Sequence, residues 1–277
     1  MEFRTTPDDV SYTRMTTQEL RRAFLFEHLF VPARVSAVYC GADRAIVGGA
    51  LPLEGPLALE STKKEMASGY FTERREIGIV NVGGPGSVQT PDAPHPLQAG
   101  DMLYLGKGTK EIRFASDDPA QPAHFYFVSF PAHATYPAAL IPRAEAEAEA
   151  LGSPSGANAR TIRRYIHSRG ARSCQLVMGI TELREGSVWN TMPPHTHVRR
   201  SEVYMYFGLP PGAMALHMMG KPDETRTLVV RDREAVLSPA WSIHAAAGTQ
   251  SYSFVWAMGG ENQEFSDMDS VNIQDIR

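Results

Sequence analysis

The strongest chemical signal in the sequence is a set of histidines and a glutamate in the C-terminal third of the chain. His195 and His197 are separated by one residue, and Glu202 follows after four more. On an extended strand, residues two apart point to the same face, so both imidazoles can reach one point in space. A turn after His197 would return the chain as a strand that carries Glu202 to the same point. The pattern therefore predicts three ligands of a divalent metal ion.

A fourth ligand is expected from His244, at the start of a much later strand, because antiparallel barrels bring distant segments side by side. The predicted metal ligands are thus His195, His197, Glu202 and His244. Nitrogen and oxygen ligands without sulfur suit zinc, iron, manganese or nickel. We predict one Zn²⁺ per subunit, with Fe, Mn and Ni as alternatives. The set fits a catalytic centre with an exchangeable position better than a closed structural one.

Side chains that could meet a substrate at this centre are less sharply defined. Strand alternation places Tyr204 and Tyr206 on the same face as Glu202, and Gln175 lies on the strand before the motif. His217 lies on another predicted strand, where it could face the barrel interior. For each of these four, packing in the barrel core is the alternative. Spacing identifies no catalytic acid or base, since Glu202 is used as a ligand, and the catalytic residues stay unknown.

The elements that must position these residues are strands. From about Val35 onward, short β-branched and aromatic runs are interrupted by Gly, Pro, Asn or Asp, which is typical of an all-β barrel or sandwich. Before them, residues 17–26 read as a short amphipathic helix that is capped by Thr16 or Thr17 and packs outside a barrel.

The strand pattern divides into two halves. An Ala/Glu run at residues 144–150, followed by a Gly/Ser/Pro segment, predicts a linker and domains at 1–150 and 151–277. Segment 100–111 parallels segment 233–244, with a glutamate at the end of the first where the second has His244. The first half has no H-x-H motif. A duplicated barrel with one metal site is therefore expected, in which the degenerate N-terminal barrel is metal-free and serves packing and assembly.

Composition excludes several classes of protein. The formal net charge is −4 and the basic residues are dispersed, so nucleic acid is not expected as a partner. Acids and hydroxyls replace the apolar run of a secretory signal near the N-terminus, and no run is long enough to span a membrane. We predict a cytoplasmic protein with no membrane partner. Cys40 and Cys174 are too few and too far apart for a disulfide framework, and both are expected to be buried and reduced.

The motif H-x-H-x4-E, with a later histidine after P-x-W-x-x, resembles the cupin superfamily. Two departures are visible: Gly186 lies further from the first histidine than usual, and Trp241 stands where the second motif has glycine. The resemblance implies an all-β bicupin with two tandem cupin (jelly-roll-like) β-barrels and a few short helices.

A closer resemblance, over essentially the whole chain, is to the 5-keto-4-deoxyuronate isomerase family. It is carried by DRAIVGGALPL, LYLGKGTKEIRFAS, WNTMPPHTHVRRSEVYMYF and LSPAWSIHAAAGT. It implies that 4-deoxy-L-threo-5-hexosulose uronate, a small-molecule uronate, is converted to 3-deoxy-D-glycero-2,5-hexodiulosonate in the degradation of pectin and other uronate glycans. In this aldose-ketose isomerisation a metal stabilises the enediolate. The resemblance also implies a homohexamer.

A uronate substrate brings a carboxylate, for which the planar fork of an arginine is well suited. The arginines near the motif in sequence are Arg163, Arg164, Arg199 and Arg200, with exposure to solvent as the alternative for each.

Other functions stay compatible with the same ligands. These are an Fe(II) cupin dioxygenase, a non-catalytic bicupin that binds or stores sugar, and a metal-dependent sugar epimerase. A requirement for oxygen would separate the dioxygenase from the isomerase.

Overall fold

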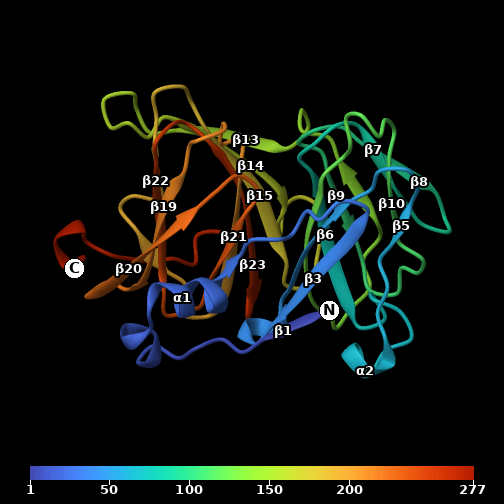
Figure 1. The fold of residues 1–277 in the computed structure, drawn as a ribbon, viewed down its shortest axis with the longest axis horizontal. Helices are drawn as coiled ribbons and strands as arrows, with labels where there is room; N and C mark the ends of the chain where they lie inside the picture. Colours follow the sequence, from blue (N-terminus) through green and yellow to red (C-terminus); the bar gives the residue numbers. More distant parts are fainter. The chain divides into compact units, whose positions relative to one another are not determined.

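The β-branched and aromatic runs form strands along most of the chain, and the predicted all-β class is confirmed. The computed structural model describes residues 1–277, and its helices are few and short (Figure 1). They are α1 (Thr17–Phe24), α2 (Lys63–Met66) and the 3-10 turns η1 (Ser11–Arg14), η2 (Ala42–Arg44) and η3 (Ile273–Asp275). None of the helices has both the length and the apolar character needed to cross a membrane.

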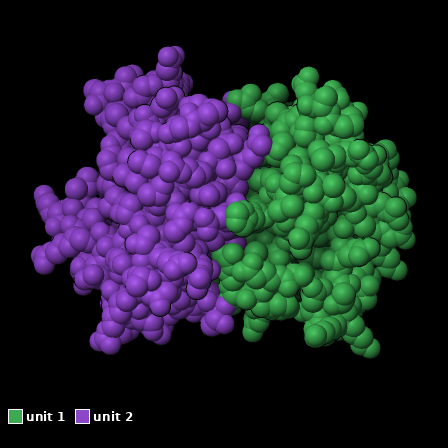
Figure 2. All heavy atoms as spheres, viewed as in Figure 1, with its two compact units in different colours: residues 1–4, 28–147, 165–177 green, residues 5–27, 148–164, 178–277 purple.

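The chain forms two compact units, and each is built from several segments (Figure 2). Unit 1 contains residues 1–4, 28–147 and 165–177, and unit 2 contains residues 5–27, 148–164 and 178–277. These units differ from a single division at residue 150. Helix α1 belongs to unit 2 because its apolar face, with Leu20 and Phe24, is buried, and the Phe24 ring meets Trp241 edge-on at 6.2 Å.

Unit 1 is a barrel of two sheets. The seven-stranded sheet has the order β1 (Glu2–Arg4), β3 (Arg34–Cys40), β4 (Ile46–Leu51), β11 (Phe125–Pro131), β6 (Arg75–Asn81), β9 (Met102–Leu105), β12 (Ala139–Ile141). The four-stranded sheet has the order β5 (Leu57–Ala58), β10 (Arg113–Ser116), β7 (Gly86–Gln89), β8 (Pro94–Leu97).

Unit 2 repeats this plan. Its seven-stranded sheet has the order β13 (Glu147–Leu151), β14 (Arg160–Ile166), β15 (Val177–Leu183), β23 (Ser253–Gly260), β18 (Arg200–Phe207), β21 (Ala235–Ser238), β2 (Leu25–Phe26). The four-stranded sheet has the order β16 (Trp189–Asn190), β22 (Ile243–Gly248), β19 (Ala215–Lys221), β20 (Glu224–Val230). A separate pair joins β17 (His195–Thr196) and β24 (Asp269–Ser270).

The registers show which positions of the two barrels are equivalent. Strand β6 lies between β11 and β9, as β18 lies between β23 and β21. Ile77 is the third residue of β6 and is paired with Leu105, the last residue of β9. In the same way, Glu202 is the third residue of β18 and is paired with Ser238, the last residue of β21. Ile77 therefore occupies in unit 1 the position that Glu202 occupies in unit 2.

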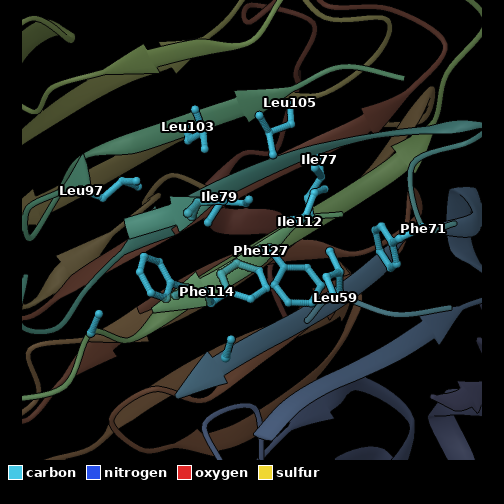
Figure 3. Packing of buried hydrophobic residues seen from close by; sticks show 14 of the residues in the cluster. Leu59, Phe71, Ile77, Ile79, Leu97, Leu103, Leu105, Ile112, Phe114 and Phe127 are labelled. Atoms are coloured by element: carbon cyan, nitrogen blue, oxygen red, sulfur yellow. The ribbon is translucent and has the colours of Figure 1, made fainter. Parts of the chain in front are cut away.

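The interior of unit 1 is closed by carbon side chains at that position (Figure 3). Ile77 belongs to a buried cluster with Ile112, Phe114 and Phe127. The sequence comparison matched Glu111 to His244, but Glu111 is exposed with a φ of 49°, and its neighbour Ile112 is the residue that joins the core. Glu111 therefore does not face the barrel interior, whereas His244 is buried.

Three further expectations differ from the structure. The predicted helix ends at Phe24, and Leu25 and Phe26 form β2, which pairs with β21. Thr16 is its cap, since its side chain accepts from the Glu19 backbone while the Glu19 side chain accepts from the Thr16 backbone. The predicted linker contains β13, which pairs with β14 although its Glu and Ala residues are exposed and have low strand propensity. Both cysteines are free, but Cys40 is buried and Cys174 is partly exposed.

Candidate metal centre

Three elements of unit 2 bring the four predicted ligands to one point. His195 lies on β17, His197 follows it, Glu202 lies on β18 and His244 is the second residue of β22. Their ligand atoms all lie within 4.8 Å of one another. His195 Nε2 is 3.1 Å from His197 Nε2 and 3.0 Å from His244 Nε2, and Glu202 Oε2 is 3.1 Å from His197 Nε2 and 2.9 Å from His244 Nε2.

Hydrogen bonds behind two of the rings fix their orientation. His197 Nδ1 donates to the Asp267 carbonyl at 2.7 Å. His244 Nδ1 lies 3.2 Å from Ser238 Oγ, whose own hydroxyl donates to the Ser242 carbonyl, so the ring donates to the serine. These contacts direct the Nε2 atom of each ring to the shared point. Such contacts behind the ligands are typical of metal-binding histidines.

Two of the four ligands have clearly shifted pKa values. Burial, together with the neighbouring His244, lowers the pKa of His195 to about 2. Burial acts to raise the pKa of Glu202, but His244 and His197 outweigh it and hold that pKa well below its usual range. Three imidazole nitrogens and one carboxylate oxygen thus converge on one point. These are atoms of the kind that coordinate divalent cations in proteins. The cluster can bind a metal.

A pocket of about 260 Å³ opens on the cluster and is lined entirely by unit 2. His195, His197 and Glu202 form its polar end, and most of its wall is apolar, including Phe254 and Trp256. Protein pockets for small ligands begin at roughly 300 Å³, so this space suits one small molecule rather than a polymer.

The two predicted tyrosines have different places. Tyr204 lines the pocket, with its hydroxyl 3.1 Å from Thr191 Oγ1 and its ring edge-on to His244 at 5.2 Å. Tyr206 does not line it, and its hydroxyl lies 2.7 Å from Nδ1 of His217 in the core. His217 faces the barrel interior, without reaching the pocket. Of the two tyrosines, Tyr204 therefore has the position to meet a substrate.

The other predicted contacts lie outside the pocket. Gln175 belongs to unit 1, where its amide donates to the Pro131 carbonyl. The four arginines proposed from sequence have other partners: Arg163 pairs with Glu182, Arg164 with Glu149, Arg199 with Asp267, and Arg200 donates to the Asp267 carbonyl. None of them lines the pocket.

One arginine that sequence reasoning missed does line it. Arg160, the first residue of β14, shares the pocket wall with Ile162, two residues further along the same strand face. Alternation along this strand was a partial signal, because it separates Arg160 and Ile162 from Arg163 but leaves Arg164 on their face. Nearness in sequence to the metal motif instead selected four arginines that do not line the pocket.

Asp267 is a second residue that the sequence did not single out. Its carbonyl accepts from both His197 and Arg200, while its carboxylate is held by Arg199 and by Asn262 at 2.6 Å. These contacts hold the pKa of Asp267 well below its usual range, chiefly through Arg199 and then Asn262. The residue thereby fixes the segment that carries Phe265 and Met268 into the pocket wall.

A duplicated β-barrel with a three-histidine, one-glutamate cluster in one barrel defines a bicupin, and solved structures share this fold. The chain belongs to the KduI/IolB family, whose model matches residues 37–275. It is 49% identical over 277 residues to the 4-deoxy-L-threo-5-hexosulose-uronate ketol-isomerase of Opitutus terrae and 48% identical over 277 residues to that of Caldicellulosiruptor bescii, with both chains covered fully. An IolB-like protein from Salmonella typhimurium LT2 superposes with a TM-score of 0.68 at 18% identity, covering 82% of this chain and 87% of the other.

Proposed function

We propose that the protein is a ketol-isomerase that converts 4-deoxy-L-threo-5-hexosulose uronate to 3-deoxy-D-glycero-2,5-hexodiulosonate in the degradation of pectin and related uronate glycans. The observation that carries the proposal is full-length identity of 48–49% to relatives with this named activity. The pocket supports the proposal, because its volume of about 260 Å³ suits one small molecule and its polar cluster lies at one end of a mostly apolar wall.

The residues of the pocket account for the requirements of the reaction. A proton must move from C2 to C1 of the aldose, without an external oxidant. A divalent cation held by His195, His197, Glu202 and His244 would supply Lewis-acid polarisation of the substrate carbonyl. The Tyr204 hydroxyl, held by Thr191, is placed to hydrogen-bond a substrate oxygen, and the apolar wall excludes water from the reacting carbons.

Zinc is the proposed metal, with one ion per subunit. The absence of sulfur and the presence of three nitrogens and one oxygen support it, although iron, manganese and nickel accept the same donors. We also propose a cytoplasmic homo-oligomer, a hexamer by family resemblance, that acts on a small molecule and binds neither nucleic acid nor membrane. The net charge of −4 supports the absence of a nucleic-acid partner, and the two free cysteines support the cytoplasmic location, while the hexamer rests on the family resemblance.

The test is conversion of the 5-keto aldehyde by purified protein of measured metal content under anaerobic conditions, followed by NMR. The 2,5-diketo acid should form without oxygen, and His197→Ala should lose both metal and conversion. An oxygen requirement would indicate the dioxygenase, and no conversion by fully metallated protein would leave a sugar-binding bicupin.

A further inference from the structure

We infer that Arg160 binds the carboxylate of the substrate and makes the pocket selective for sugar acids. The inference rests on the proposed function and names the group that recognises the end of the substrate away from the reaction. In the proposed substrate, the aldehyde carbon and the carboxylate carbon are the two ends of one six-carbon chain. A site for it therefore needs a cation apart from the group that handles the carbonyl.

The charges in the pocket favour this assignment. Among the residues that line it, Arg160 is the single arginine or lysine. The one acid among them, Glu202, is engaged at 3.1 Å and 2.9 Å by His197 and His244. Arg160 forms no ion pair in the structure, and its Nη1 donates to the neutral carbonyl of Asn158 at 3.0 Å. Its charge is therefore not compensated by a carboxylate of the protein.

The surroundings of Arg160 make an anion a favourable partner. The side chain is partly buried, and burial lowers the pKa of its guanidinium, although arginine stays charged under all ordinary conditions. An unpaired charge beside apolar walls is less well solvated than one in water, so a carboxylate gains more from pairing with it. The planar fork can hold both carboxylate oxygens, which a lysine cannot do.

Arg163 on the same strand offers a matched control. It lies on the other face of β14, pairs with Glu182 through Nε at 3.0 Å and does not line the pocket. Arg163→Ala deletes an arginine from the same strand and removes no group that lines the pocket. A loss of function that reflects only weakened β14 would appear in both variants.

The experiment compares Arg160→Ala, Arg160→Lys and Arg163→Ala in the metal-loaded enzyme. Loss of a charge-assisted pair should raise KM for the uronate on the order of 10- to 100-fold in Arg160→Ala, with a smaller rise in Arg160→Lys. The kcat should change much less, because the carboxylate does not react and its binding is shared by ground and transition states. An unchanged KM in Arg160→Ala, or an equal rise in Arg163→Ala, would overturn the inference.

A binding measurement separates this inference from the proposed function. D-glucuronate and D-glucose are titrated into each metal-loaded protein, and binding is followed by ligand-observed NMR. The wild type and Arg163→Ala should prefer glucuronate by about tenfold or more, and Arg160→Ala should lose this preference. A preference that depends on Arg160 in a protein without isomerase activity would sink the proposed function alone. No preference in the wild type, or one that survives in Arg160→Ala, would refute the role of Arg160.

Discussion

The hydrogen bond between His244 and Ser238 gives a prediction for metal affinity that can be separated from effects on the stability of the fold. Ser238 is almost fully buried on β21, and its Oγ accepts from His244 Nδ1 at 3.2 Å. Ser238→Ala removes that acceptor, adds no volume and alters no ligand. The imidazole would then be free to rotate or to change its tautomer, and its Nε2 lone pair would be less well directed.

The expected magnitude follows from the geometry. Loss of a partner behind a metal-binding histidine typically weakens metal affinity by about 10- to 100-fold. The 3.2 Å distance is at the long end for an N–H···O hydrogen bond, so the lower part of this range is expected. We predict a rise of roughly 10- to 30-fold in the metal Kd, or about 1.4–2 kcal/mol.

A nearby serine supplies the control. Ser242 is also buried, but its Oγ accepts from the Gly220 backbone and donates to the Ile243 carbonyl, without touching a histidine. Ser242→Ala should lower the free energy of unfolding and leave the metal Kd unchanged. Zinc affinity is measured by competition with a chromogenic chelator. Equal Kd values for Ser238→Ala and the wild type would refute the view that Ser238 directs His244.

Two further predictions concern the stability of unit 2. Tyr12 stacks on Trp241 at 4.7 Å, and its hydroxyl bridges the Lys221 N–H and the Glu224 carbonyl, so Tyr12→Phe should cost about 1–3 kcal/mol in a urea titration. The control is Tyr70 in unit 1, whose hydroxyl makes no hydrogen bond, so Tyr70→Phe should cost little, and equal losses would contradict this account. Burial lowers the pKa of His217 from 6.5 to about 3, so the unfolded chain takes up a proton first as pH falls. Stability is therefore retained above pH 6.5 and lost below it, by up to about 1.4 kcal/mol per pH unit, and His217→Asn should remove this part of the slope in unfolding curves between pH 7 and 5. A slope that is the same in both proteins would show that other groups cause it.

The sequence located the ligand cluster because the spacing of His195, His197 and Glu202 is local. Strand alternation alone predicts that two of these side chains share a face, without knowledge of the tertiary structure. In the structure, however, β17 ends at Thr196, and His197 is oriented by its hydrogen bond to the Asp267 carbonyl. The hydrogen-bond partners of those ligands could not be predicted from the sequence. Ser238 and Asp267 lie near the histidines only because the strands pair and because the C-terminal segment returns to the site.

The first barrel shows a second limit of sequence reasoning. That Ile77 stands at the position of Glu202 follows from the pairing of β6 and β9, which no local pattern reveals. Carbon side chains fill that interior, so the structure gives a physical reason to expect no metal in unit 1. This expectation stays a prediction, and metal analysis of protein with the unit 2 ligands replaced would test it.

The central claim is that one metal ion in the unit 2 cluster is required for isomerisation. The most direct test adds zinc to chelator-treated protein in fractions of an equivalent and follows anaerobic conversion of the uronate. Activity should rise in proportion to zinc and level off at one equivalent per chain, and Glu202→Gln should show no such rise. Full activity in the metal-free protein, or a plateau that Glu202→Gln reaches as well, would contradict the account.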